Sequence, residues 1–139
     1  LISAAESYFL QAEAAARGWL PGNAQTLYQQ GITASFSSYE IDPGTYITDV
    51  VAQWPAGEAN QVKAIITQKY FAMSGNQGFE AWTEWRRTGY PDFFVTSEAS
   101  NLGAGLYPQR LLYPNTEITR NSNFPGLKTV TERVWWDVN

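Results

Sequence analysis

The chain has no histidine and no cysteine in its 139 residues. These absences exclude thiol nucleophiles, disulfides and Ser-His-Asp triads, and they remove the usual ligands of a zinc site. No acidic cluster has calcium-loop spacing, and no glycine-rich stretch has the lysine of a phosphate-binding loop. We therefore predict that the chain holds no metal and needs no cofactor.

Charged residues are also scarce. They make up 16% of the chain, the net charge is −4, and neither sign occurs in blocks. This composition lacks the basic footprint of nucleic-acid binding and the polybasic patch of a membrane-surface protein. No apolar run is long enough to span a membrane, and no signal peptide opens the chain. A hydrophobic content of 44% at this length predicts one folded domain rather than a disordered chain.

A helical hairpin is predicted over residues 1–38. Ser3 and Glu6 have the spacing of a capping box, and Gly18 fits the left-handed residue that follows a helix end. Asn23 is the expected N-cap of the second helix, and the short connection predicts antiparallel packing. The pair resembles one tetratricopeptide-type unit, although no repeat of it is visible. We expect the first helix to have an inner stripe, which Phe9 and Ala16 widen, of Ala5, Tyr8, Ala12, Ala15 and Trp19.

A second helical pair is predicted over residues 58–89, with helices at 58–73 and 76–88. A loop with a short helical piece, from Tyr46 to Trp54, connects it to the hairpin. From Asp92 onward the periodicity disappears, and prolines and asparagines become frequent. We therefore predict a loop-rich tail over residues 90–139 that wraps a surface, and an all-α fold class.

Two glutamates on the predicted helix at 76–88 raise the question of catalysis. Glu80 and Glu84 lie one turn apart beside Trp82 and Trp85, which is a pattern found near glycosidase acids. Such acids usually face each other across a cleft from separate elements, whereas i,i+4 carboxylates usually lie on a solvated face or pair with arginine. We favour the second interpretation and expect no catalytic residue in the chain.

Arg86 and Arg87 follow in the last turn of the same helix. They could bind an anionic ligand, but cations at a helix C-terminus more often contact its carbonyls and the loop that follows. We favour this second role, with residues 90–94 as the loop.

Two aromatic residues are our candidates for ligand binding. Tyr46 and Trp54 lie in or beside a loop, where exposed rings could stack on sugar rings. The alternative is that both rings are buried and anchor the loop.

Several short strings together resemble the SusD/RagB family of nutrient-binding proteins, closest to its SusD-like subgroup. They occur in the family's order along nearly the whole chain. The second helical pair, over residues 58–89, carries the family's Glu-Ala-Trp-x-Glu-Trp-Arg-Arg signature. The matching segments are residues 4–19, 27–35, 65–70, 78–91, 108–114 and 133–137, with Glu117, Asn121 and Asn123 between the last two. The resemblance assigns a structural role to the signature residues Glu80, Trp82, Glu84, Trp85, Arg86 and Arg87.

The resemblance implies an all-helical, tetratricopeptide-like fold and a function in binding without chemistry. It implies a lipoprotein on the cell-surface side of a bacterial outer membrane, with its lipid anchor outside this segment. Such a protein caps a TonB-dependent, SusC-like barrel and captures glycans, or in some members peptides, for import. Family members are several hundred residues long, so we expect residues 1–139 to be a C-terminal part.

Two rival hypotheses remain. The chain could belong to a tetratricopeptide-type scaffold for protein interactions that has no part in transport. It could also belong to a helical carbohydrate-active enzyme that uses Glu80 or Glu84, which is the less favoured of the two.

Overall fold

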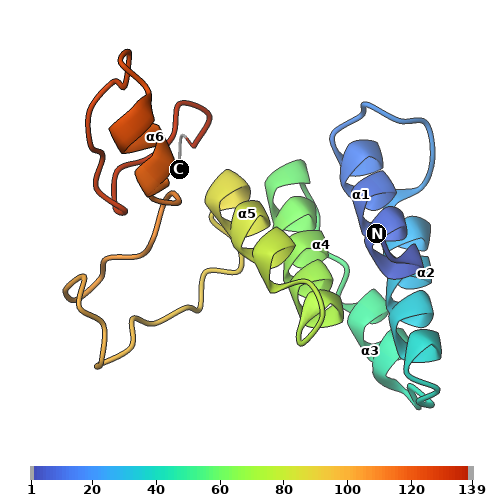
Figure 1. Ribbon diagram of the computed structural model, residues 1–139. Helices are drawn as coiled ribbons and strands as arrows, with labels where there is room; N and C mark the ends of the chain where they lie inside the picture. Colours follow the sequence, from blue (N-terminus) through green and yellow to red (C-terminus); the bar gives the residue numbers. More distant parts are fainter. Residues whose placement is uncertain (1, 138–139) are drawn as a thin grey trace. The chain divides into compact units, whose positions relative to one another are not determined.

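The computed structural model describes residues 2–137, and within this range its regular structure is entirely helical (Figure 1). The helices are α1 (Ala4–Ala16), α2 (Ala24–Ser38), α3 (Tyr46–Ala52), α4 (Glu58–Met73), α5 (Gly78–Thr88) and α6 (Asn115–Arg120). The prediction of an all-α fold is confirmed.

The chain divides into two compact units, with the boundary between Asp92 and Phe93. The first unit contains α1 to α5, and the second contains α6 and its flanking loops. Sequence periodicity missed α6 because this helix has only 6 residues. Its local signals are Pro114 directly before it and two charged residues that suit the helix dipole. These are Glu117 in the first turn and Arg120 in the last turn.

The hairpin of α1 and α2 has the predicted ends. Ser3 Oγ accepts a hydrogen bond from the Glu6 amide at 3.1 Å, and Asn23 Oδ1 accepts one from the Thr26 amide at 2.9 Å. Both contacts satisfy amide groups that the first turn of a helix leaves without partners. Gly18 follows α1 with a φ of 70°, the left-handed conformation expected of a glycine past a helix end.

Small residues allow α1 and α2 to approach closely. Gly31 on α2 faces the ring of Phe9 on α1, and a Cβ atom built on Gly31 would lie 2.8 Å from a carbon of that ring. Phe9 is 1% exposed, which makes it one of the most buried residues of the first unit. The core cluster around this contact consists of Ala5, Phe9, Ala12, Tyr28, Ile32 and Ile65.

The inner stripe predicted for α1 is partly wrong. Trp19 is 73% exposed, and its ring lies 5.2 Å from the guanidinium of Arg17 instead of packing in the hairpin. The stripe ends earlier because α1 ends at Ala16, so the chain has already left the helix at Trp19. The inward positions also include two acidic residues, Glu6 and Glu13, which are 8% and 4% exposed.

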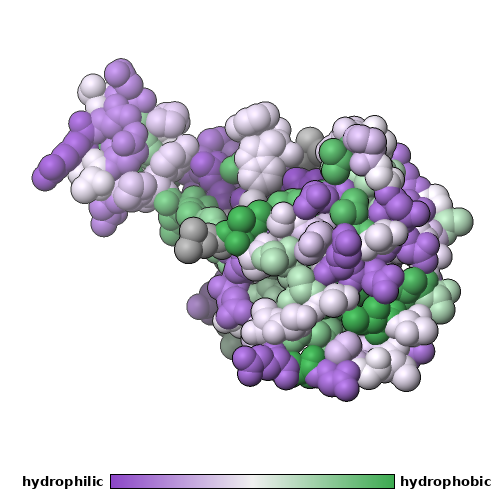
Figure 2. All heavy atoms as spheres, turned by 90° about the vertical axis from the view of Figure 1, so that its right-hand side faces the viewer, coloured by the Kyte–Doolittle hydropathy of each residue, from purple (hydrophilic) through white to green (hydrophobic). Residues whose placement is uncertain are grey.

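Helix α4 is the central element of the first unit. It packs against α1 and α2 on one side and against α5 on the other, and α3 packs against α2 (Figure 1). Its buried positions are Val62, Ile65, Ile66, Lys69 and Met73. On the face shown in Figure 2, hydrophobic side chains form small groups between hydrophilic ones.

Candidate functional site

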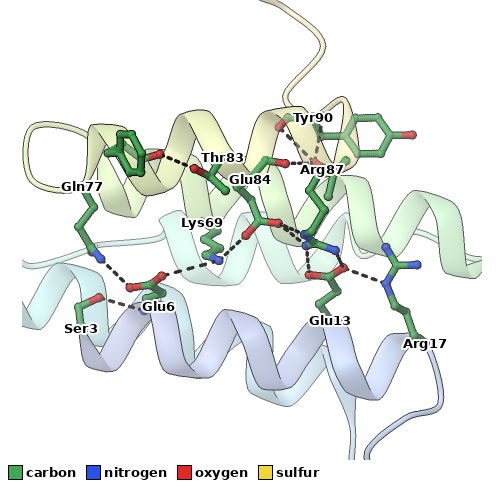
Figure 3. A network of polar contacts seen from close by, with 12 residues as sticks. Ser3, Glu6, Glu13, Arg17, Lys69, Gln77, Thr83, Glu84, Arg87 and Tyr90 are labelled. Carbon is green, nitrogen blue, oxygen red and sulfur yellow. Dashed lines mark hydrogen bonds and ion pairs between the residues drawn. The ribbon is translucent and has the colours of Figure 1, made fainter. Parts of the chain in front are cut away.

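Acidic and basic side chains meet between α1, α4 and α5 in a network whose carboxylates and lysine are largely buried (Figure 3). Lys69 on α4 has only 3% of its side chain exposed. Its Nζ lies 2.6 Å from Oε2 of Glu84 on α5 and 3.9 Å from Oε1 of Glu6 on α1. Gln77, just before α5, donates a hydrogen bond from Nε2 to Glu6 Oε2 at 2.6 Å. One lysine therefore joins carboxylates from two other helices.

Glu13 is the second carboxylate of α1 in this network. Arg87 contacts both of its oxygens, and Arg17 donates from Nε to Oε1 at 2.8 Å. Arg87 also pairs with Glu84, one turn earlier on α5. Burial alone would raise the pKa of Glu13, but the hydrogen bonds and charges of Arg87 and Arg17 outweigh burial and hold this pKa below its ordinary value. Glu13 is therefore a stable anion at neutral pH.

The network explains what the glutamates of α5 do. Glu84 is held by Lys69 and Arg87, whereas Glu80 is exposed on the surface. The two carboxyl groups therefore have different surroundings and do not face each other across a cleft. Each buried charge of the network has a partner of opposite sign on another helix, so removal of one partner would leave a buried charge without its counter-ion.

The remaining signature residues lie along α5. The Arg86 guanidinium lies 3.8 Å from the centre of the Trp82 ring, and Phe79 packs against the same ring at 5.4 Å. Arg86 is buried, whereas Trp82 and Trp85 are half-buried. Sequence reasoning expected an arginine partner for Glu84, which Arg87 provides, and a contact of Arg87 with the following loop. It did not find the contact of Arg87 with Glu13, which is 74 residues away in the chain.

Tyr46, the first ligand-binding candidate, is the first residue of α3 and is 38% exposed. Its hydroxyl accepts a hydrogen bond from Gln68 Nε2 at 2.8 Å, and its ring packs against Phe36 at 5.4 Å. The ring forms part of a pocket of about 220 Å³. The pocket is lined by Phe9, Ile32, Ser35, Phe36, Tyr39, Ile41, Tyr46, Gln68, Phe71 and Ala72.

Trp54, the second candidate, lies just after α3 and is half-buried. Its ring packs against Tyr28, with 5.0 Å between the ring centres. Burial raises the pKa of the Tyr28 hydroxyl, which therefore stays protonated. Trp54 also lines a second pocket of about 410 Å³. Gln68 lines both pockets, so the pockets of the two candidates share one glutamine.

Tyr46 is the one lining residue of its pocket that sequence reasoning proposed, and the missed residues include Tyr39, Gln68 and Phe71. The sequence does carry a signal for Phe71, because this aromatic residue lies outside the apolar stripe of α4. In the structure, 51% of Phe71 is exposed. Tyr39 directly follows α2, where a helix end brings side chains into a loop. Gln68 carries no such signal, because a glutamine on a helix is ordinarily a surface residue.

The part of the chain from residue 2 to 137 contains no cluster of acidic side chains suited to a metal ion. In the same range, none of the helices combines the length and the hydrophobicity that crossing a membrane requires.

Comparison with known proteins identifies relatives along most of the chain. A family model for SusD-like proteins, described as starch-binding and associating with the outer membrane, matches residues 1–114. No curated protein matches the chain.

Several solved structures have the same fold. A chitin-binding SusD homologue from Flavobacterium johnsoniae is 31% identical with a TM-score of 0.80, and it covers 100% of this chain. A second chitin-binding protein is 36% identical with a TM-score of 0.79 over 99% of this chain. A SusD homologue from Bacteroides fragilis is 33% identical with a TM-score of 0.70, also over 99%. The present chain spans 36%, 33% and 34% of these three proteins, about a third of each. These matches confirm the tetratricopeptide-like helical fold.

Proposed function

Because this chain belongs to the SusD-like family, we propose that it serves in a cell-surface glycan-binding protein of the bacterial outer membrane. The observation that carries this proposal is the family match over residues 1–114. The protein would deliver its glycan to a TonB-dependent, SusC-like barrel, to which it binds as a cap. A lipid anchor outside these 139 residues would hold it at the membrane.

Chitin fragments are the first glycans to test. Two of the solved structures that share this fold, at 31% and 36% identity, are chitin-binding proteins. Tyr46 and Trp54 are the aromatic residues that we assign to the glycan, since each lines a pocket of the first unit. Starch fragments and peptides are the competing nutrient classes.

We further propose that the glycan leaves the protein unchanged. Glu84 forms ion pairs with Lys69 and Arg87, and Glu80 is exposed to solvent. Neither glutamate therefore lies opposite a second carboxylate as a catalytic acid would. A glycosidase needs two carboxyl groups on either side of the scissile bond.

Isothermal titration of the full-length protein with chitin, starch and peptide oligomers tests the binding function. We expect heat of binding from one oligosaccharide class and no shortened product after prolonged incubation. Product that disappears in the Glu84→Gln variant would instead favour the carbohydrate-active enzyme.

Co-purification from outer membranes tests the partnership. We expect the full-length protein to retain a TonB-dependent barrel. Retention of other proteins without any barrel, together with no heat of binding in the titrations, would favour the tetratricopeptide-type scaffold.

A further inference from the structure

We propose that the pocket framed by Tyr39, Tyr46 and Phe71 holds one neutral sugar ring of the glycan and that Gln68 binds its hydroxyl groups. This inference rests on the proposed glycan-binding function and assigns it a specific place on the first unit.

The three rings come from different segments and remain open to solvent. Tyr39 follows α2, Tyr46 begins α3, and Phe71 lies in the last turns of α4. Their exposed fractions are 49%, 38% and 51%. A sugar ring has one face of C–H groups, which packs well on an open aromatic face, while its hydroxyls need polar partners. The pocket offers such aromatic surface from three segments of the chain.

The floor of the pocket is rigid. It includes Phe9 and Ile32, which are 1% and 2% exposed and belong to the core between α1 and α2. Tyr46 is fixed from two sides, by its hydrogen bond to Gln68 and by packing against Phe36. A site whose side chains are already held in place loses less conformational entropy when it binds a ligand.

Polar groups in the wall distinguish this pocket from an ordinary apolar contact surface. Both Gln68 Nε2 and Gln68 Oε1 lie within hydrogen-bond distance of the Tyr46 hydroxyl, at 2.8 and 3.1 Å, and Gln68 also contacts the Tyr28 hydroxyl. An amide has two N–H donors and a carbonyl oxygen with two lone pairs, so part of its capacity is left for a ligand hydroxyl. The Tyr39 hydroxyl accepts a hydrogen bond from Asn76, so it is also oriented. Ser35 adds a further hydroxyl to the lining. A ligand with hydroxyls around an apolar ring matches this combination.

Charge and size narrow the ligand class. None of the residues that line the pocket is acidic or basic, so the pocket offers no partner for a carboxylate or sulfate group. Its volume of about 220 Å³ is below the roughly 300–1,000 Å³ of pockets for drug-sized ligands. One ring of a neutral oligosaccharide fits this description, with the rest of the chain outside.

Titration of the full-length protein with chitin tetrasaccharide tests the assignment. We expect Tyr46→Ala and Phe71→Ala each to weaken affinity about tenfold, the scale of a central aromatic contact. Tyr46→Phe keeps the ring and should weaken affinity less, whereas Gln68→Ala should weaken it because the hydroxyl partner is lost. Trp19→Ala is the matched control, because Trp19 is 73% exposed and does not line the pocket, and it should leave affinity unchanged.

Thermal denaturation of each variant separates binding from folding. If Tyr46→Ala and Phe71→Ala bind the tetrasaccharide as the wild type does, the assignment is wrong. A lower melting temperature in these variants would then show that the two rings pack against protein. The glycan-binding function would then stand. If the wild type binds neither chitin nor starch oligomers, the function and the assignment both fail.

Discussion

Arg87 on α5 binds both carboxylate oxygens of Glu13 on α1, with Nη1 2.9 Å from Oε1 and Nη2 2.6 Å from Oε2. This fork geometry is specific to a guanidinium and a carboxylate, and a lysine could not reproduce it. The pair ties together two helices that both pack on α4.

Removal of Glu13 should therefore be costly. Its side chain is 6% exposed, so Glu13→Ala leaves Arg87 and Arg17 without their buried partner. We expect the free energy of unfolding to fall by about 3 kcal/mol, the lower end for a broken buried pair, because Arg87 is partly exposed. Urea denaturation measures the loss.

The matched control for this variant is Glu132→Ala. Glu132 pairs with Lys128 on the surface, with side-chain exposures of 43% and 42%. An exposed pair contributes less than about 1 kcal/mol. Equal losses for both glutamates would contradict the role assigned to the buried network.

Acid should weaken the same contact. Folding lowers the pKa of Glu13 below its ordinary value of 4.5: burial opposes the shift, but the hydrogen bonds and charges of Arg87 and Arg17 outweigh it. A carboxyl group of this kind stabilises the fold fully above its unfolded pKa, and the contribution is lost as pH falls through the folded pKa. The stability difference between wild type and Glu13→Gln should thus stay constant at neutral pH and shrink below pH 4.5. Urea denaturation of both proteins on either side of that pH measures it, and a difference that grows in acid would contradict the mechanism.

Gly31→Ala should destabilise the hairpin. Alanine is normally the better helix former by about 1 kcal/mol. Here its Cβ would lie 2.8 Å from the Phe9 ring, and such overpacking typically costs about 1–3 kcal/mol. Thermal denaturation followed by circular dichroism would show a lower melting temperature. Gly78→Ala is the control, since a Cβ there meets nothing within 4 Å, and it should not lower the melting temperature.

Glycan affinity should depend little on salt. The Tyr46 pocket has no charged lining residue, so screening of surface charges has no direct effect on its contacts. We expect the dissociation constant of the full-length protein for chitin tetrasaccharide to change by less than about twofold between low and high salt. A large loss of affinity in high salt would indicate an ionic binding mode at another place.

Local signals in the sequence were sufficient for most of the helices. The bounds of α4 were predicted at residues 58–73, as observed, because its apolar positions recur at helical spacing. The caps at Ser3 and Asn23 were predicted because each needs only residues three positions apart. Helix α5 begins at Gly78 instead of residue 76, a shift typical of helix ends without a side-chain cap.

The candidate site was less predictable because its contacts are not local. The burial of Glu6 and Glu13 was not predicted, and Glu6 was interpreted only as part of a capping box. Their burial follows from the packing of α1 and α5 on α4, which brings Lys69 and Arg87 to them. Tyr46 was predicted from its exposure in a loop, but Gln68 reaches it from 22 residues away.

The contact between Gly31 and Phe9 also restricts which amino-acid substitutions this hairpin can accept during evolution. With the phenylalanine ring in place, any side chain at position 31 meets it, so selection should remove substitutions there before they spread. A smaller residue at position 9 would open the space that a side chain at position 31 requires. The two positions therefore have a preferred order of replacement, position 9 before position 31, and related sequences should show large residues at one position only when the other is small.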